Sequence, residues 1–125
     1  MKRDSLERSP RLYLSEIVSY IEIIESITRG LTYETFMKDV RNVYSVDDLL
    51  RNIGEAVRVL SKHGKVKQLF YCYRIPYADL SDMRTDLTHE YFSMNTKSIW
   101  ETATKTLPKL KPQFEKVLNE LQKTP

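Results

Sequence analysis

Three side chains between positions 84 and 91 carry the groups that metal-free phosphodiester chemistry needs. Arg84 is a permanent cation whose planar fork of donors suits a phosphate. His89 has an imidazole, the side-chain group that most often takes a proton from one oxygen and returns one to another in enzymes. Tyr91 adds a hydroxyl and a stacking face. With a ribose 2′-OH as nucleophile and Arg84 stabilising charge on the phosphorus centre, this set predicts cleavage of RNA.

Residue types alone leave a plainer interpretation open. A histidine near the end of a helix is usually a surface or capping residue, and an arginine five positions before it is usually solvated or salt-bridged. On types alone, this structural interpretation of Arg84 and His89 is the more common one. His63, beside Gly64, is more typical of a residue at a helix C-terminus.

Other kinds of active site find little support. Asp79, Asp82 and Asp86 could hold Mg²⁺ through water, but we interpret them as solvated carboxylates. The two histidines and one cysteine lack zinc-site spacing. The chain has no Gly-rich phosphate loop and no nucleophile elbow, which argues against a kinase, a dehydrogenase or a serine hydrolase. We therefore expect no metal and no cofactor.

A condition on geometry follows if the candidate residues share a helix. The pattern predicts a helix over residues 77–88, reset by Ile75-Pro76 before it. At about 100° per residue, Arg84 and His89 would lie roughly 140° apart, whereas Arg84 and Tyr91 would lie about 20° apart. One straight helix cannot aim all three at one atom. Either the helix ends near His89, or a second subunit completes the site across a two-fold axis.

Apolar residues at three- and four-residue spacing predict the remaining elements. Ser9 and Pro10 indicate the start of a first helix, and Gly30 indicates its end. Gly54 interrupts a later apolar stripe, at a cost of about 1 kcal/mol relative to Ala, which predicts close approach of a neighbouring helix. We expect helices over residues 10–29, 32–38, 46–61 (or from 39), 77–88 and from 95 or 96 onward, the last kinked or divided by Pro108 and Pro112.

The fold class that follows is all-α, an up-and-down helical bundle of four to five helices in a single domain, 1–125. Residues 65–74 are left undecided, because Leu69–Tyr73 is the best strand candidate but is short and isolated. His63-Gly64 is interpreted as the stop of the preceding helix. We interpret Cys72 as a buried small apolar residue rather than a catalytic thiol.

The composition indicates which partners and which cellular compartment suit the molecule. A net charge of +3 permits contact with RNA without demanding it. A single cysteine suits a reducing cytoplasm. No apolar run approaches the roughly 20 residues that span a bilayer, and residues 1–8 are charged without a signal-peptide core. We expect a cytoplasmic protein with no membrane partner.

The segment Met83–Phe92 resembles the Arg-x4-His-x-Tyr motif of HepT-like toxins in the HEPN superfamily. The likeness covers most of the chain. Further matching segments are Tyr33–Asp39, the Ile-Gly-Glu-Ala run at Ile53–Val57, Ile75-Pro76-Tyr77, Ile99-Trp100-Glu101 and Leu107-Pro108. The order and spacing of these segments make the match more specific than the short motif alone.

The resemblance implies a function. It implies a homodimer around the motif helix and a metal-independent RNA endonuclease, the toxin of a type VII-like toxin–antitoxin system, in which Arg84 and His89 carry catalysis. It further implies that a minimal nucleotidyltransferase (MNT) antitoxin uses ATP to adenylylate Tyr91. Glu55 and Thr85 would support the motif, although the family usually has Asn where this chain has Thr85 and an aliphatic residue where it has Thr88.

Two alternatives remain. The first is a non-catalytic HEPN module that presents a nucleotide or substrate to a partner nucleotidyltransferase, with Arg84 as a phosphate anchor. The departure at Thr85 favours this alternative, because threonine lacks the paired donor and acceptor of an amide. The second is a structural helical dimer whose polar segment is only solvated.

Overall fold

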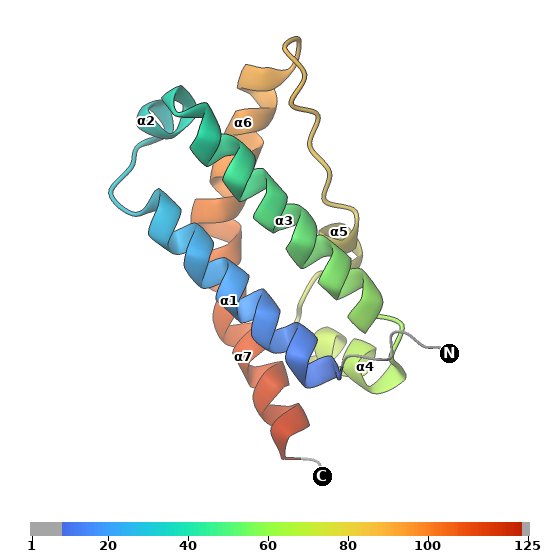
Figure 1. Ribbon diagram of the computed structural model, residues 1–125. Coiled ribbons are helices and arrows are strands. Elements are labelled where there is room, and N and C mark those ends of the chain that lie inside the picture. The colour runs from blue at the N-terminus through green and yellow to red at the C-terminus, as the bar shows by residue number, and fades with distance from the viewer. Residues whose placement is uncertain (1–8, 124–125) are drawn as a thin grey trace.

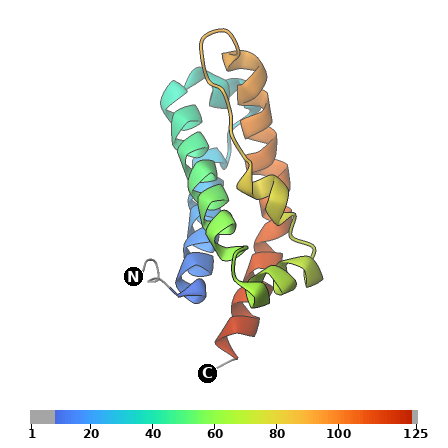
Figure 2. The ribbon, with the colours of Figure 1, turned by 90° about the vertical axis from the view of Figure 1, so that its right-hand side faces the viewer.

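The computed structural model describes residues 9–123, and every regular element in that range is a helix (Figures 1 and 2). The predicted all-α bundle is therefore confirmed. The charged start at residues 1–8 lies outside the described residues. The elements are α1 (Pro10–Thr28), α2 (Tyr33–Lys38), α3 (Val40–Leu60), α4 (Gly64–Cys72), α5 (Tyr77–Ser81), α6 (Phe92–Glu101), the π-helical turn η1 (Thr102–Thr106) and α7 (Leu107–Gln122).

The first helix begins and ends where its sequence signals predict. The Ser9 hydroxyl accepts a hydrogen bond from the backbone N–H of Leu12, and Pro10 occupies the first turn, where its missing N–H is harmless. The helix ends at Thr28, and Gly30 then adopts a φ of +78°. A residue with a side chain rarely adopts that backbone conformation, which explains why glycine occupies this position.

The third helix is the longer of the two predicted versions. Asp39 caps it by accepting a hydrogen bond from the backbone N–H of Arg41 at 3.1 Å. The predicted close approach at Gly54 is confirmed, because a Cβ on this residue would lie 2.7 Å from the backbone carbonyl oxygen of Leu80. Helix α5 can pack this closely on α3 only because residue 54 has no side chain.

The undecided segment before Ile75 is the helix α4, which begins at Gly64. The interpretation of Gly64 as the stop of the preceding helix is wrong, because it is the first residue of this one. Its end is a Schellman motif, in which Ile75 N–H donates to the Phe70 carbonyl and Arg74 N–H donates to that of Tyr71. Arg74 has a φ of 59°, a conformation in which glycine is usual.

The interpretation of Cys72 as a buried residue is wrong, because the thiol is exposed. The core-facing side of α4 is defined by Val66 and Phe70, both buried. Cys72 follows Phe70 by two residues, and at about 100° per residue it therefore lies on the opposite side of the helix.

The last helical region is divided just before Pro108, as predicted, whereas α7 continues through Pro112 and is not divided there. It begins at Phe92, earlier than the predicted residues 95 or 96, and α6 passes through η1 into α7. The Leu107 N–H donates to the Thr102 carbonyl, five residues back, which widens the turn. Pro108 has no N–H to offer an α-helical bond, so a wide turn here accommodates it.

Helix α1 packs against both α3 and α7, and the core lies between these three long elements (Figure 1). No helix among residues 9–123 combines the length and apolar character needed to cross a membrane. Among residues 9–123, the largest fully buried side chains are Leu14, Ile17, Ile21, Ile24, Phe36, Ile53, Leu60, Phe70, Ile75, Ile99, Leu107 and Phe114.

Candidate active site

The segment that carries the candidate residues is extended, and the predicted helix over residues 77–88 is wrong beyond Ser81. Helix α5 ends there, and residues 83–87 have no helical structure. Side-chain exposure alternates, with Met83, Thr85 and Leu87 half-buried and the residues between them exposed. This period of two is that of an extended chain with one side against the bundle. The predicted angles on a helix therefore do not apply.

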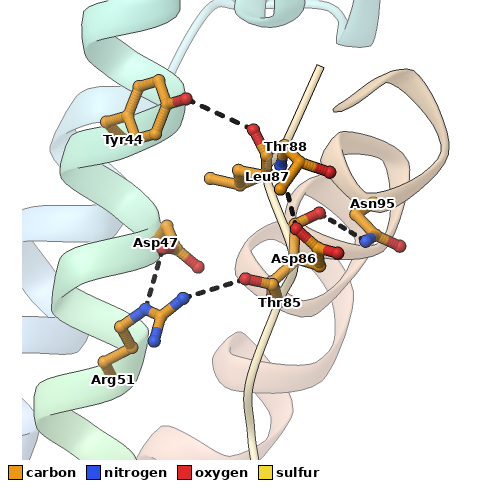
Figure 3. Close-up of polar contacts among 8 residues, drawn as sticks. All are labelled: Tyr44, Asp47, Arg51, Thr85, Asp86, Leu87, Thr88 and Asn95. Carbon is orange, nitrogen blue, oxygen red and sulfur yellow. Dashed lines mark hydrogen bonds and ion pairs between the residues drawn. The ribbon is translucent and has the colours of Figure 1, made fainter. Parts of the chain in front are cut away.

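Side chains from neighbouring helices replace the helical hydrogen bonds of this segment (Figure 3). The Arg51 guanidinium donates to the Thr85 carbonyl at 2.8 Å, and the Tyr44 hydroxyl donates to the Leu87 carbonyl at 3.4 Å. From α6, the Asn95 amide donates to the Asp86 carbonyl. The extended segment thus lies between α3 and α6 and is held by both.

A local side-chain hydrogen bond within the segment also disfavours a helix. The Asp86 carboxylate accepts a hydrogen bond from the Thr88 N–H at 2.9 Å. Aspartate and threonine side chains commonly offer the backbone such local alternatives, which lowers their preference for helix interiors. Thr85 and Thr88 both lie in this stretch.

A buried carboxylate fixes the most important of the supporting side chains. Asp47 is only 6% exposed, and its Oδ2 lies 2.9 Å from the Nε of Arg51, one turn later on α3. This ion pair orients the guanidinium so that a second nitrogen reaches Thr85. Sequence reasoning did not identify Asp47 or Arg51. The i,i+4 spacing of an acid and an arginine was the available signal, but many exposed helical pairs share it.

Arg84 lines a hollow of about 240 Å³ between α3 and the end of α5. Glu55 and Arg51 line the same hollow, so Arg84 does lie beside the predicted supporting residue Glu55. A side-chain hydrogen bond from Arg58 holds the pKa of Glu55 below its ordinary value, with a smaller electrostatic contribution from Arg84. Arg51 and Arg84 both line this hollow, and guanidinium groups are well suited to bind phosphate oxygens.

His89 lines a different hollow, of about 400 Å³, beside the beginning of α3. Val40, Tyr44, Leu87 and Phe92 form its mostly apolar wall.

Tyr91 is the N-cap residue of α6 and is 42% exposed, so its ring is open to solvent two residues beyond His89. The hydroxyl of Tyr91 is therefore within reach of another protein.

One chain does not bring Arg84 and His89 together. The two hollows lie about 16 Å apart, because their α3 residues are centred about eleven positions apart and a helix rises about 1.5 Å per residue. A reaction that uses both side chains at one phosphate needs a second copy of the chain or a rearrangement of the segment.

Comparison with known proteins identifies the family of the chain. The family described as ribonuclease HepT-like matches residues 17–117, which is most of the chain. The chain belongs to the ribonuclease HepT-like family. The predicted class, a HepT-like ribonuclease, is confirmed.

Several similar proteins are described as ribonucleases. "Putative RNase MJ0125" of Methanocaldococcus jannaschii is 34% identical over 93% of this chain and 97% of its own length. "Probable ribonuclease HepT" of Thermococcus cleftensis is 34% identical over 90% of this chain and 98% of its own length. "Putative RNase TTE0752" of Caldanaerobacter subterraneus is also 34% identical, over 90% and 97%. No solved structure gives a significant match.

The segments that resemble the HepT-like family form the support around the motif. Phe36 packs on Trp100 with ring centroids 5.1 Å apart, and the Tyr33 hydroxyl donates to the Ser93 carbonyl at the start of α6. Ile75 is buried at the turn into α5. Within residues 9–123, no group of three or more His, Cys, Asp or Glu side chains is arranged to hold a metal ion.

Proposed function

We propose that this HepT-like chain is a metal-independent RNA endonuclease, the toxin of a type VII-like toxin–antitoxin system. The observation that carries the proposal is the family match together with an exposed Arg84 in the extended segment and an exposed His89 in the turn that follows it. In the proposed reaction, the ribose 2′-OH attacks the adjacent phosphorus and loses its proton to a histidine. The bond from phosphorus to the 5′ oxygen breaks, and that oxygen takes up a proton. Arg84 stabilises the charge that develops on the phosphate oxygens.

The active unit in this proposal is a homodimer. Support comes from the separation of about 16 Å between the Arg84 and His89 hollows and from an exposed apolar patch beside His89. Four of the large apolar side chains that remain exposed, Val40, Tyr44, Tyr91 and Met94, lie at the beginnings of α3 and α6, the end of the bundle that also holds the His89 hollow. Such a patch on a small soluble chain is typical of a surface that a partner covers.

A two-fold axis offers a simple way to combine the two side chains. If two extended segments cross antiparallel with the axis between Asp86 and Leu87, then residue 84 of each copy faces residue 89 of the other. Each of the two sites would then use Arg84 from one copy and His89 from the second. The Arg84 hollow would bind the phosphate, and the histidine would move the protons.

The direct test is cleavage of labelled RNA by the purified protein in EDTA. We expect cleavage by the wild type, and a loss of at least about a hundredfold in His89→Ala, because general acid–base catalysis contributes about that much. Lys38→Ala, a surface substitution on α2, is the matched control for protein quality. Equal activity of wild type and His89→Ala would refute the proposal.

Regulation by adenylylation of Tyr91 is the second part of the proposal. The ring is exposed, and it lies two residues from His89, so an attached AMP would add bulk and negative charge beside the cleft and repel RNA phosphates. The modifying partner would be a minimal nucleotidyltransferase that uses ATP. Intact-mass analysis after co-expression should show AMP additions on the wild type and none on Tyr91→Phe. An unmodified wild-type chain beside an active partner would contradict this part alone.

The separation of Arg84 and His89 in one chain also favours a second candidate, a non-catalytic module that binds a nucleotide for a partner nucleotidyltransferase. Arg84, beside Arg51, would be its phosphate anchor. Titration calorimetry with ATP distinguishes the two candidates. Tight nucleotide binding that Arg84→Ala abolishes, in a protein that does not cleave RNA, would support the module.

A further inference from the structure

The positive charge of the chain is concentrated around α4. Residues 56–78 contain five arginines and lysines and no aspartate or glutamate. The net charge of the whole chain is only +3, so the remaining residues together are net acidic. A basic stretch in an otherwise acidic molecule indicates an anionic ligand at that place.

Aromatic side chains accompany these cations. Tyr71 is 78% exposed, which is unusual for so large a ring on the side of a helix. Together with Arg74, Pro76 and Tyr77 it lines an open hollow of about 570 Å³. That volume lies within the roughly 300–1,000 Å³ of small-molecule sites, so it can admit a base and its sugar. The ammonium group of Lys67 lies 5.7 Å from the centre of the Tyr77 ring.

Arg74 occupies a position that a smaller residue would fill at lower cost. Its left-handed conformation is one in which glycine is usual and a residue with a side chain is strained. The side chain is exposed, and it forms no ion pair with any other residue that the structure describes. A strained, exposed cation in the wall of an aromatic hollow indicates a role in binding.

The hollow has a rigid base. The Phe70 ring packs edge-on against Phe114 of α7, with centroids 6.1 Å apart. The Gln113 amide donates to the Tyr73 carbonyl at 3.1 Å, and the Tyr73 hydroxyl donates to Glu120 at 3.2 Å. Burial and the Glu120 carboxylate raise the pKa of Tyr73, so this hydroxyl remains a donor at neutral pH. The exposed side chains of α4 are therefore presented on a fixed helix.

We propose that Lys67, Tyr71, Arg74 and Tyr77, here called the α4 surface, form a secondary binding site for single-stranded RNA. A base stacks on Tyr71, and the cations contact the backbone phosphates, which is how proteins commonly bind single strands without reading their sequence. The proposal rests on the proposed ribonuclease function and adds the path of the substrate.

The position of the α4 surface agrees with such a path. Figure 2 shows α4, α5 and the extended segment one after another along the same face of the bundle. An RNA strand bound at Tyr71 can therefore continue past α5 to the Arg84 hollow. Binding remote from the cleaved bond would hold long substrates more tightly than short ones.

The test measures RNA binding apart from cleavage. A fluorescently labelled single-stranded oligoribonucleotide is titrated by anisotropy with the His89→Ala protein, which keeps the substrate intact. Tyr71→Ala in this background should raise Kd about fivefold or more and leave its dependence on salt unchanged, because a stacking contact is lost. Arg74→Gly should raise Kd and lower the slope of log Kd against log salt by about 0.7, because one phosphate contact is lost.

Arg74→Gly also distinguishes a lost RNA contact from a general loss of stability. Glycine relieves the strained backbone, so the melting temperature should stay level or rise while RNA affinity falls. Arg29→Ala, at the far end of α1 from α4, is the matched control and should change neither Kd by more than about twofold nor the fold. In the cleavage-competent protein, Tyr71→Ala should raise KM for long RNA with kcat unchanged.

The outcomes separate this proposal from the proposed function. Cleavage of RNA by the wild type, with Tyr71→Ala and Arg74→Gly indistinguishable from Arg29→Ala in Kd, would overturn the α4 surface alone. Loss of binding to a co-expressed nucleotidyltransferase, with RNA affinity unchanged, would assign the surface to a protein partner and also overturn it. Neither binding nor cleavage by the wild type would overturn both proposals.

Discussion

A mixed dimer of two inactive variants should recover ribonuclease activity. Arg84→Ala and His89→Ala each remove one group from every site of their own homodimer. If each site combines Arg84 of one copy with His89 of the second, a heterodimer of the two variants has one site with both groups and one with neither. This is the expected arrangement, because Arg84 and His89 of one chain line two hollows that lie about 16 Å apart along α3.

The expected magnitude follows from counting sites. A preparation that contains heterodimers only should show about half of the wild-type cleavage rate per dimer, whereas each homodimer should fall by at least about a hundredfold. The two variants are co-expressed with different affinity tags and purified on both in turn, which removes the homodimers. Cleavage of labelled RNA in EDTA then gives the rate. A doubly tagged dimer of His89→Ala with itself controls for contaminating nuclease.

The result that refutes this reasoning is an inactive heterodimer. It would mean that Arg84 and His89 of the same chain act on one phosphate, and hence that the segment leaves its extended form when RNA binds. A monomer in sedimentation experiments that still cleaves RNA would lead to the same conclusion. Either result would leave the ribonuclease activity intact and remove the two-fold site.

Further predictions concern the support of the segment. Arg51→Met removes the donor to the Thr85 carbonyl and should lower stability by about 1–3 kcal/mol in urea titrations, with a parallel loss of cleavage. Gly54→Ala should cost about 1–3 kcal/mol by the same measurement, because its Cβ meets a backbone oxygen of α5. Gly64→Ala, with nothing within 4 Å of the added Cβ, should be neutral or stabilising. Glu55→Gln should cost less than about 1 kcal/mol at neutral pH. The lowered pKa of this carboxyl means that its contribution is lost as the pH falls below the ordinary value of 4.5, so the two unfolding curves should converge there.

The helices were predictable where the sequence carries its own signals. Ser9, Pro10 and Gly30 define α1 through capping and left-handed backbone geometry that depend on a few neighbouring residues. Gly54 gave a tertiary prediction as well, since a glycine in an apolar stripe has few explanations other than close packing. These features are local, and a single sequence is sufficient to interpret them.

The conformation of the motif was not predictable in the same way. Residues 83–87 contain enough apolar positions to suggest a helix, but their carbonyls are satisfied by Tyr44, Arg51 and Asn95 from distant parts of the chain. The identities of Arg84, His89 and Tyr91 followed from their types and from the family resemblance. Their distances depend on tertiary hydrogen bonds that no periodicity records.

Tyr44, Arg51 and Asn95 hold the extended segment by donating hydrogen bonds to its backbone carbonyl oxygens, not by accepting them from its backbone N–H groups. Among the described residues, none of the backbone N–H groups of residues 84–87 donates to another backbone group. Such amides exchange with solvent deuterium at rates set by small local fluctuations, whereas amides of α1, α3 and α7 exchange only when much of the bundle opens. Hydrogen exchange should therefore be fast at the amides of residues 84–87 and slow in helices α1, α3 and α7. A partner that binds the extended segment will slow exchange at those amides without changing exchange in the three helices.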